Sequence, residues 1–212
     1  LRSGKVTPLS PDLRFDYDLD VKGERVVVLG GDDQNPYEIS ALERGSLRPL
    51  THHNDWLSER RLARTEPVRF VSADGTAIEG LLTLPLDHQN GQPAPLIVRL
   101  HGGPVYQFSH EFMPDWQIYA THGYAVLGVN PRGSSGRGFD FSRAIYADWG
   151  RLDVADVIAG VEHVVARGIA DPDRLAVGGW SYGGILTNAV IARDTRFKAA
   201  VSGAGASNMY AL

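Results

Sequence analysis

The residues best suited to chemistry in this sequence surround Ser181. Gly179-Trp180-Ser181-Tyr182-Gly183 fits the pattern G-x-S-x-G, follows an apolar run and opens a segment with helical periodicity. A serine on a tight turn from a strand into a helix has its hydroxyl pushed out of the sheet, and small neighbours allow that strained turn to pack. We therefore predict that Ser181 is a nucleophile that attacks a carbonyl carbon and forms an acyl-enzyme.

A second motif could stabilise the negative charge that such an attack creates. His101-Gly102-Gly103-Pro104 follows another short apolar run. A tetrahedral oxyanion needs two backbone N–H groups at about 3 Å, and a side chain in this loop would block their approach. We predict that the N–H groups of Gly103 and Tyr182 form the oxyanion hole. His101 is expected to fix the loop through a hydrogen bond rather than to act as a base.

The elements that must position these motifs alternate between strands and helices. The predicted strands are Val68–Ala73, Thr76–Pro85, Pro95–His101, Tyr124–Val129, Arg174–Gly178 and Lys198–Ser202, and the predicted helices are Pro114–Thr121, Phe139–Trp149, Leu152–Arg167 and Ser181–Ala192. A hairpin around Asp74-Gly75 followed by this alternation indicates an α/β fold with a mostly parallel sheet. In the α/β-hydrolase fold the nucleophile follows the fifth strand and the second oxyanion donor follows the third, which is where Ser181 and Gly103 fall.

Other polar residues near this site have structural explanations that we favour. The segment Asn130–Gly138 is rich in glycine but lacks the spacing of a nucleotide-binding loop. We expect Arg132 to brace the active-site loops by bonding carbonyls or a carboxylate, with substrate contact as the alternative. Asp148, Asp153 and Asp156 could suggest a metal site. We favour another explanation, because Asp153 and Asp156 lie in the first turns of a predicted helix, where carboxylates complement the dipole and bind free N–H groups. We therefore predict no metal and no cofactor.

The acid and base that would activate Ser181 do not follow it in this sequence. In this fold the triad runs Ser, then Asp or Glu, then His along the chain. All seven histidines precede Ser181, and the only carboxylate after it is Asp194. The sequence stops just beyond the sixth predicted strand, so we expect the triad Asp and His to lie outside it. Without a base a serine hydroxyl is a poor nucleophile, and the isolated chain is expected to be inactive.

The first 64 residues show a different pattern, made of short strands. Leu1–Ser10 and Leu42–Thr51 repeat a spacing of Leu, Gly and Pro about 40 residues apart, which is typical of a β-propeller blade. Two unrelated turns are the alternative. We predict that residues 1–64 are the C-terminal end of a partial β-propeller domain. Residues 65–212 are predicted to be the N-terminal part of an α/β-hydrolase domain, truncated after about the sixth strand.

Composition excludes several classes of protein. Of the 212 residues 43% are hydrophobic and 22% charged, the net charge is −4, and no basic cluster suits nucleic acid. The absence of cysteine rules out disulfides, thiolate catalysis and cysteine-based zinc sites. No apolar run approaches the ~20 residues that span a bilayer, so no membrane partner is predicted. The first residues form no signal peptide and do not include Met, so we expect the true N-terminus upstream and a cytoplasmic location.

Together these motifs resemble the catalytic domain of the prolyl oligopeptidase family of serine peptidases. The resemblance rests on Pro95–Pro104, Asn130–Gly138, Asp148–Gly150 with Asp153 and Asp156, and Gly179–Gly184, in this order and spacing. The acylaminoacyl-peptidase-like branch is the best match, because His-Gly-Gly-Pro is typical of it. The family carries a β-propeller ahead of its hydrolase domain, which agrees with the blade-like first region. The resemblance also implies that Ser181 is the nucleophile and that Tyr182 and Gly103 are the oxyanion donors.

The resemblance implies a serine-type peptidase acting on short peptides, with the propeller restricting access by folded proteins. Oligopeptidase, acylaminoacyl-peptidase and dipeptidyl-peptidase modes all fit. The alternative is a carboxylesterase on the same fold, and a third hypothesis is a non-catalytic binding module. The propeller-like stretch and Trp180-Ser181-Tyr182 favour the peptidase. Short peptides are the expected partners, and a homo-oligomer of the full-length enzyme is left open.

Overall fold

The computed structural model describes residues 4, 8–9, 13–89, 91–206 and 208. The chain divides into two compact units, which we describe separately. The first comprises Leu1–Leu62 together with Ser109–Pro114, and the second comprises Ala63–Phe108 and Asp115–Leu212. The assignment of residues 1–64 and 65–212 as two domains stays a prediction. Within the described residues, no helix has both the length and the apolar character needed to cross a bilayer.

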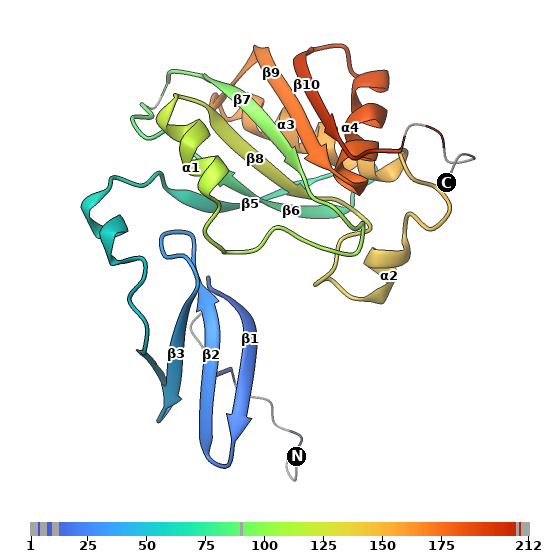
Figure 1. The fold of residues 1–212 in the computed structure, drawn as a ribbon. Coiled ribbons are helices and arrows are strands. Elements are labelled where there is room, and N and C mark those ends of the chain that lie inside the picture. The colour runs from blue at the N-terminus through green and yellow to red at the C-terminus, as the bar shows by residue number, and fades with distance from the viewer. Residues whose placement is uncertain (1–3, 5–7, 10–12, 90, 207, 209–212) are drawn as a thin grey trace. The chain divides into compact units, whose positions relative to one another are not determined.

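The first unit is built on a four-stranded antiparallel sheet (Figure 1). Its strands are β1 (Phe15–Lys22), β2 (Arg25–Gly31), β3 (Glu38–Glu43) and β4 (Ser46–Pro49), which pair in sequence order. A short 3₁₀ helix, η1 (Asp55–Glu59), follows. Four neighbouring antiparallel strands in one sheet are the arrangement of a propeller blade. Most of Leu1–Ser10, the first copy of the predicted repeat, lies outside the described residues.

Two side chains of the segment Ser109–Pro114 bind residues of this first unit. The His110 Nδ1 atom lies 2.6 Å from a carboxylate oxygen of Asp33, and both side chains are 17% exposed. The Tyr37 hydroxyl donates a hydrogen bond to the Glu111 carboxylate. These contacts explain why a segment so distant in sequence belongs to the same compact unit.

The second unit contains a mixed six-stranded sheet. Its strands are β5 (Thr65–Val71), β6 (Ala77–Thr83), β7 (Ala94–Leu100), β8 (Ala125–Asn130), β9 (Ala170–Trp180) and β10 (Phe197–Gly203), in the spatial order β10-β9-β7-β8-β6-β5. The β5–β6 hairpin pairs antiparallel with β8, while β8, β7, β9 and β10 are parallel. Pro67 lies in the edge strand β5, where its missing N–H does no harm. As predicted, β9 is the fifth strand of this sheet along the chain.

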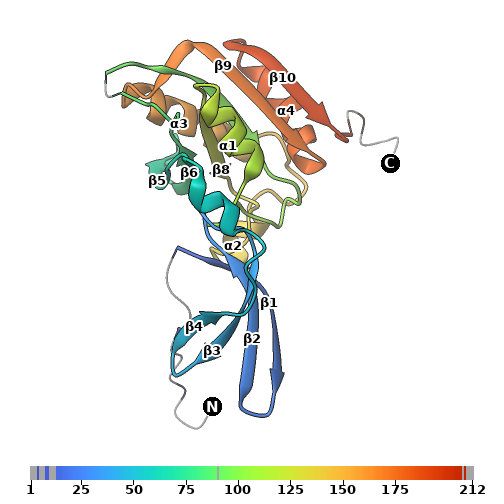
Figure 2. The same ribbon diagram turned by 60° about the vertical axis from the view of Figure 1, so that its left-hand side comes forward.

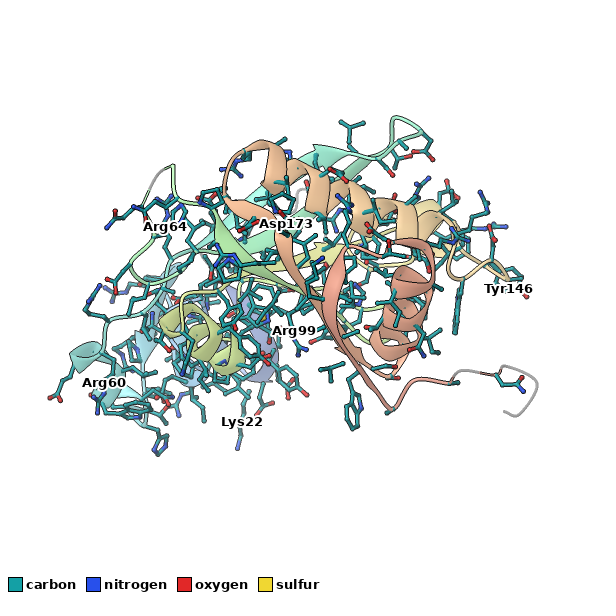
Figure 3. The ribbon with its side chains drawn as sticks, turned by 90° about the horizontal axis from the view of Figure 1, so that it is seen from above. Lys22, Arg60, Arg64, Arg99, Tyr146 and Asp173 are labelled. Atoms are coloured by element: carbon teal, nitrogen blue, oxygen red, sulfur yellow. The ribbon has the colours of Figure 1, made fainter. Side chains whose placement is uncertain are left out.

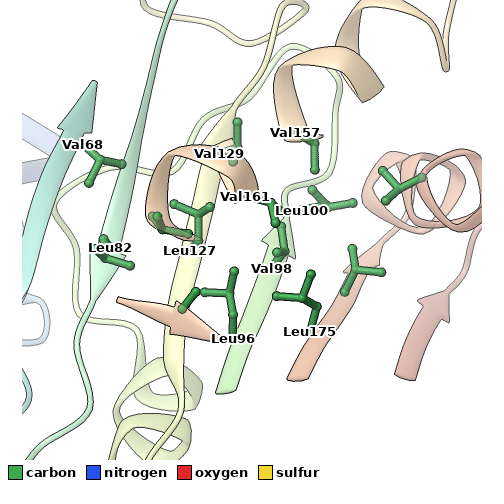
Figure 4. Close-up of a cluster of buried hydrophobic side chains, with 14 of the residues drawn as sticks. Val68, Leu82, Leu96, Val98, Leu100, Leu127, Val129, Val157, Val161 and Leu175 are labelled. Atoms are coloured by element: carbon green, nitrogen blue, oxygen red, sulfur yellow. The ribbon is translucent and has the colours of Figure 1, made fainter. Parts of the chain in front are cut away.

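Helices cover both faces of this sheet (Figures 1 and 2). One face carries α1 (Pro114–Thr121), and the other carries α3 (Leu152–Ala166) and α4 (Tyr182–Arg193). The main core lies between the sheet and α3 and α4 (Figure 4), where Val157 and Val161 of α3 and Leu96 and Val98 of β7 are fully buried. Burying a side chain of this size stabilises the fold by about 1.5–3 kcal/mol.

The structure corrects the predicted helix Phe139–Trp149. The observed helix α2 ends at Arg143 (Phe139–Arg143), and the chain continues through turns in which Ala147 has φ 55°. Ile145, within these turns, is 1% exposed and is among the buried core residues. Burying this one side chain thus competes with helical continuation. The β9 strand also begins earlier than predicted, at Ala170 instead of Arg174.

Candidate active site

Ser181 is the single residue between the end of β9 and the start of α4. Its backbone has φ 58° and ψ −122°, and its side chain is exposed. A non-glycine residue in such a conformation costs about 1–3 kcal/mol and needs support from its surroundings. The Ser181 N–H donates to the Gly203 carbonyl at 2.9 Å, and its carbonyl accepts from the Gly184 and Ile185 N–H groups at 2.9 and 3.1 Å. The backbone on both sides of the serine is therefore held in place.

The glycines that flank Ser181 are required by close packing against the end of β7. A Cβ atom at Gly183 would lie 2.2 Å from the Leu100 carbonyl oxygen, and one at Gly179 would lie 2.5 Å from the same atom. No side chain fits at such distances. This confirms that the small neighbours of the serine allow the strained turn to pack.

The loop after β7 lies directly against the serine. A Cβ atom at Gly102 would be 3.7 Å from the Ser181 Cβ atom, and Gly103 has φ 122°, a conformation that glycine adopts most easily. Tyr182 is the first residue of α4, so its N–H has no intrahelical acceptor. The structure thus brings the loop that contains Gly103 together with Ser181 and Tyr182.

His101 is held by contacts with neighbouring loops. Its Nε2 atom lies 2.9 Å from the Ser134 hydroxyl and its Nδ1 atom 2.7 Å from the Gly102 carbonyl oxygen. Burial of the ring lowers the pKa of His101 below its ordinary value. Both ring nitrogens therefore have partners, one in its own loop and one in the segment after β8, and the role of His101 in fixing the loop stays a prediction.

Arg132 joins three parts of the second unit. Its Nε and Nη2 atoms donate to the Asp156 carboxylate at 2.9 and 2.6 Å, and its Nη1 atom donates to Asp74 in the β5–β6 turn. Arg132 is 7% exposed and Asp156 is 0% exposed. The hydrogen bond from Arg132 lowers the pKa of Asp74 to about 2. Arg132 thus binds two carboxylates, and its support of the active-site loops stays a prediction.

The interpretation of Asp156 as a helix-dipole partner was wrong. Both of its carboxylate oxygens bind Arg132, one of them also accepting from the Arg132 backbone N–H at 2.9 Å. The sequence did contain a signal for its burial. Asp153 and Asp156 are spaced three residues apart beside the valine stripe of α3, a spacing that places both on one side of the helix close to the core.

Asp153 accepts hydrogen bonds from neutral donors and links α3 to the turn that carries Ser181. Its carboxylate accepts from the Gly150 N–H at 3.0 Å, the Val154 N–H at 2.9 Å and the Tyr182 hydroxyl at 2.6 Å. The Tyr182 ring also packs edge-to-face on Trp149, with centroids 5.1 Å apart. Burial raises the pKa of Tyr182 well above its ordinary value, and the Asp153 charge adds to the effect. The sequence places Asp153 in the first turn of the helix, but no local pattern indicates its hydrogen bond with Tyr182.

The three aspartates that could suggest a metal are distributed among different partners. Asp148 pairs with Arg151, while Asp153 and Asp156 have the partners described above. Each carboxylate is thus committed to its own part of the structure.

A cavity of about 1140 Å³ opens beside the oxyanion loop. Its lining is mainly apolar and consists of Pro104, Val105, Phe139, Ser142, Arg143, Ile145, Tyr146, Ala147 and Trp149. Pro104 directly follows Gly103, and Trp149 contacts Tyr182, so the cavity adjoins both predicted oxyanion donors. Tyr146 is 86% exposed and projects from the loop after α2 (Figure 3).

These features define the class of protein. A sheet of this strand order, an exposed serine on a strained turn after its fifth strand and a glycine loop after its third are those of an α/β-hydrolase. The sequence model of the prolyl oligopeptidase family matches residues 110–212. The chain belongs to the prolyl oligopeptidase family, which confirms the resemblance found in its motifs.

Similar proteins agree with this assignment. The chain is 36% identical over 176 residues to the uncharacterized peptidase YuxL of Bacillus subtilis, a match that covers 82% of this chain and 27% of that protein. It is 35% identical over 184 residues to dipeptidyl aminopeptidase BIII of Pseudoxanthomonas mexicana, covering 83% of this chain and 26% of the relative. The chain thus spans about a quarter of the length of these curated relatives.

Solved structures resemble the chain over most of its length. An acylaminoacyl peptidase in complex with Z-Gly-Gly-Phe-chloromethyl ketone superimposes with a TM-score of 0.86 at 31% identity, covering 93% of this chain and 32% of that one. A Mycobacterium tuberculosis puromycin-hydrolyzing peptidase gives a TM-score of 0.84 at 30% identity, covering 91% of this chain and 30% of that one.

Proposed function

We propose that this chain supplies the nucleophile and the oxyanion hole of a serine-type peptidase that hydrolyses short peptides. Ser181 Oγ attacks the carbonyl carbon of a peptide bond, and the carbonyl oxygen takes up the negative charge. The N–H groups of Tyr182 and Gly103 donate to that oxygen. The C–N bond then breaks, the amine leaves with a proton, and the acyl group remains on Ser181 as an ester. Water hydrolyses this ester and releases the acid.

The observation that supports this proposal most strongly is the close approach of two separate loops. Ser181 is held at φ 58° with its side chain exposed, and a Cβ atom at Gly102 would lie only 3.7 Å from the Ser181 Cβ atom. A strained serine next to a glycine loop serves acyl transfer, because the carbonyl oxygen of a substrate needs backbone donors within about 3 Å.

The proton of Ser181 has to pass to a general base. His101 is the buried histidine of the neighbouring loop, but its two ring nitrogens contact Gly102 and Ser134. The relatives are three to four times as long as the matched segment, since it covers 27% and 26% of their lengths. We place the base and its acidic partner in a part of the enzyme beyond this sequence, so that residues 1–212 alone are inactive.

The cavity beside Pro104 offers room for an apolar part of the substrate. It begins one residue after Gly103 and contains the exposed rings of Phe139 and Tyr146. Its volume of about 1140 Å³ exceeds what one side chain fills. This supports a substrate of more than one residue, as in a short peptide.

The test is hydrolysis of acyl-alanyl and alanyl p-nitroanilides and of p-nitrophenyl esters by the protein that carries this sequence. We expect anilide turnover that Ser181→Ala lowers by roughly 10⁴-fold or more. Ser58→Ala removes the hydroxyl of another exposed serine, in the first unit, and should leave turnover unchanged. Esters cleaved without anilide turnover would favour a carboxylesterase. No turnover and no labelling of Ser181 by a fluorophosphonate would favour a binding module.

A further inference from the structure

We propose that Asp153 is a positioning residue of the oxyanion hole and acts through the Tyr182 phenol. This inference rests on the proposed function, because it concerns the donor that Tyr182 contributes to that reaction. Asp153 is 0% exposed in the first turn of α3, and its partners are the Gly150 N–H, the Val154 N–H and the Tyr182 hydroxyl. Its influence on the reaction must therefore pass through a neighbour.

The set of partners around Asp153 is unusual for a buried carboxylate. It accepts hydrogen bonds from the Gly150 N–H, the Val154 N–H and the Tyr182 hydroxyl. Among the ion pairs of the described residues, none includes Asp153. Burying a carboxylate is costly unless donors surround it. We infer that the buried carboxylate of Asp153 is there to hold these three hydrogen-bond donors in place.

Of these three groups, Tyr182 is the one that reaches the reacting atoms. Its hydroxyl binds Asp153 and its ring packs on Trp149, so the side chain is held at both its tip and its face. The N–H predicted to bind the oxyanion is attached to the same Cα atom. Holding the phenol thus holds the peptide unit that joins Ser181 to Tyr182.

The strain at Ser181 explains why such a hold is needed. With φ 58° and ψ −122°, the serine would lower its energy by rotating toward an ordinary conformation. That rotation would turn the Ser181–Tyr182 peptide and carry the Tyr182 N–H away from the oxyanion. The Asp153–Tyr182 hydrogen bond opposes this relaxation at the far end of the Tyr182 side chain.

The expected consequence appears in the transition state more than in substrate binding. An oxyanion donor binds most strongly when charge develops on the carbonyl oxygen, so a misplaced donor lowers kcat and leaves KM nearly unchanged. Loss of a whole donor costs about 10²–10³-fold in kcat. A donor that is present but free to rotate should cost less, about 10-fold.

The experiment compares Tyr182→Phe, Asp153→Ala and the double variant in the protein that carries this sequence, with a peptide p-nitroanilide as substrate; alanine is used because an asparagine would still accept from the Tyr182 hydroxyl. Active sites are titrated with a fluorophosphonate so that kcat refers to folded enzyme. Each single variant should lower kcat about 10-fold with KM within about 2-fold of wild type. The kcat of the double variant should be no lower than that of the less active single variant, because both changes break the same hydrogen bond. Affinity for a peptide boronic acid should fall in parallel with kcat/KM.

A matched control separates positioning from stability. Tyr124→Phe removes a hydroxyl just before the start of β8, at the opposite end of the parallel strands from Ser181, and should leave kcat unchanged. Three results would overturn the proposal: wild-type kcat per titrated site in Tyr182→Phe, a lowered unfolding temperature as the only effect of both variants, or multiplicative losses in the double variant. Wild-type protein that neither turns over nor labels would remove the proposed function itself, and this proposal with it.

Discussion

Two buried aspartates of the same helix have their carboxylates stabilised by different kinds of partner. Asp153 and Asp156 are three residues apart in α3, and both are 0% exposed. Asp156 binds the guanidinium of Arg132, whereas Asp153 binds two backbone N–H groups and one phenol. A buried ion pair depends on both of its charges, while a carboxylate among neutral donors depends on their number and direction.

Through these two aspartates, α3 holds two different regions of the second unit in place. Through Arg132, Asp156 secures the segment after β8 and the β5–β6 turn at Asp74. Through Tyr182, Asp153 secures the turn that carries Ser181. We expect the first link to dominate the stability of the unit and the second to dominate the geometry of the site.

The largest effect on stability is expected from Arg132→Met. It leaves Asp156 buried without its cation, which should cost about 3–5 kcal/mol of unfolding free energy. Denaturant titration measures the loss. Replacing both partners, as Arg132→Met with Asp156→Leu, should recover most of it, because no charge then remains buried. A cost below about 1 kcal/mol for the single change would mean that Asp156 does not depend on the ion pair.

A smaller loss is expected when the carboxylate held by neutral donors is removed. Asp153→Ala leaves the Tyr182 hydroxyl and the Gly150 N–H without their acceptor but also removes a buried charge. The unfolding free energy should fall by about 1–3 kcal/mol, less than for Arg132→Met. The same titration tests this order, and a reversed order would contradict the division of roles.

The outer part of the Arg132 network should respond to acid. The pKa of Asp74 is about 2 in the folded protein, below its ordinary value of 3.8. A lowered pKa contributes stability above pH 4, which is lost as the pH falls toward 2. The stability difference between wild type and Asp74→Asn should therefore be present at pH 5–7 and shrink between pH 4 and pH 2. A difference that persists at pH 2 would show that Asp74 acts by another route.

The smallest effect is expected at an exposed ion pair of the same region. Asp148 and Arg151 form a salt bridge three residues apart, with side chains 38% and 58% exposed. Water screens such a pair, so Arg151→Gln should leave the denaturation midpoint unchanged within error. A clear shift would mean that burial is not what separates the strong links of this region from the weak ones.

Much of the second unit could be predicted because its signals are local or follow general rules of topology. Apolar runs and turn residues indicated the strands. The rule that places the nucleophile after the fifth strand related Ser181 to Gly103, which lies 78 positions earlier in the sequence. The helix α2 was predicted too long, because the burial of Ile145 is decided by tertiary packing. At Arg143, where α2 ends, the sequence has no residue that would stop a helix strongly enough to outweigh the helical pattern.

The partners of the buried carboxylates could not be predicted from the sequence. Arg132 binds Asp156 and Asp74, which lie on opposite sides of it along the chain and meet only in the folded sheet. The bond between Asp153 and Tyr182 depends on how α3 packs beside α4. Residue spacing places the two aspartates on one side of a helix but does not say which donor faces each of them.

The membership of Ser109–Pro114 in the first compact unit has a consequence for folding during synthesis. The contacts of Asp33 with His110 and of Tyr37 with Glu111 can form only after β5, β6 and β7 have been made. Ribosomes add about 5–20 residues per second, so these partners follow Leu62 by roughly 2–10 s. The N-terminal sheet therefore reaches its final state late, while the second unit is already emerging.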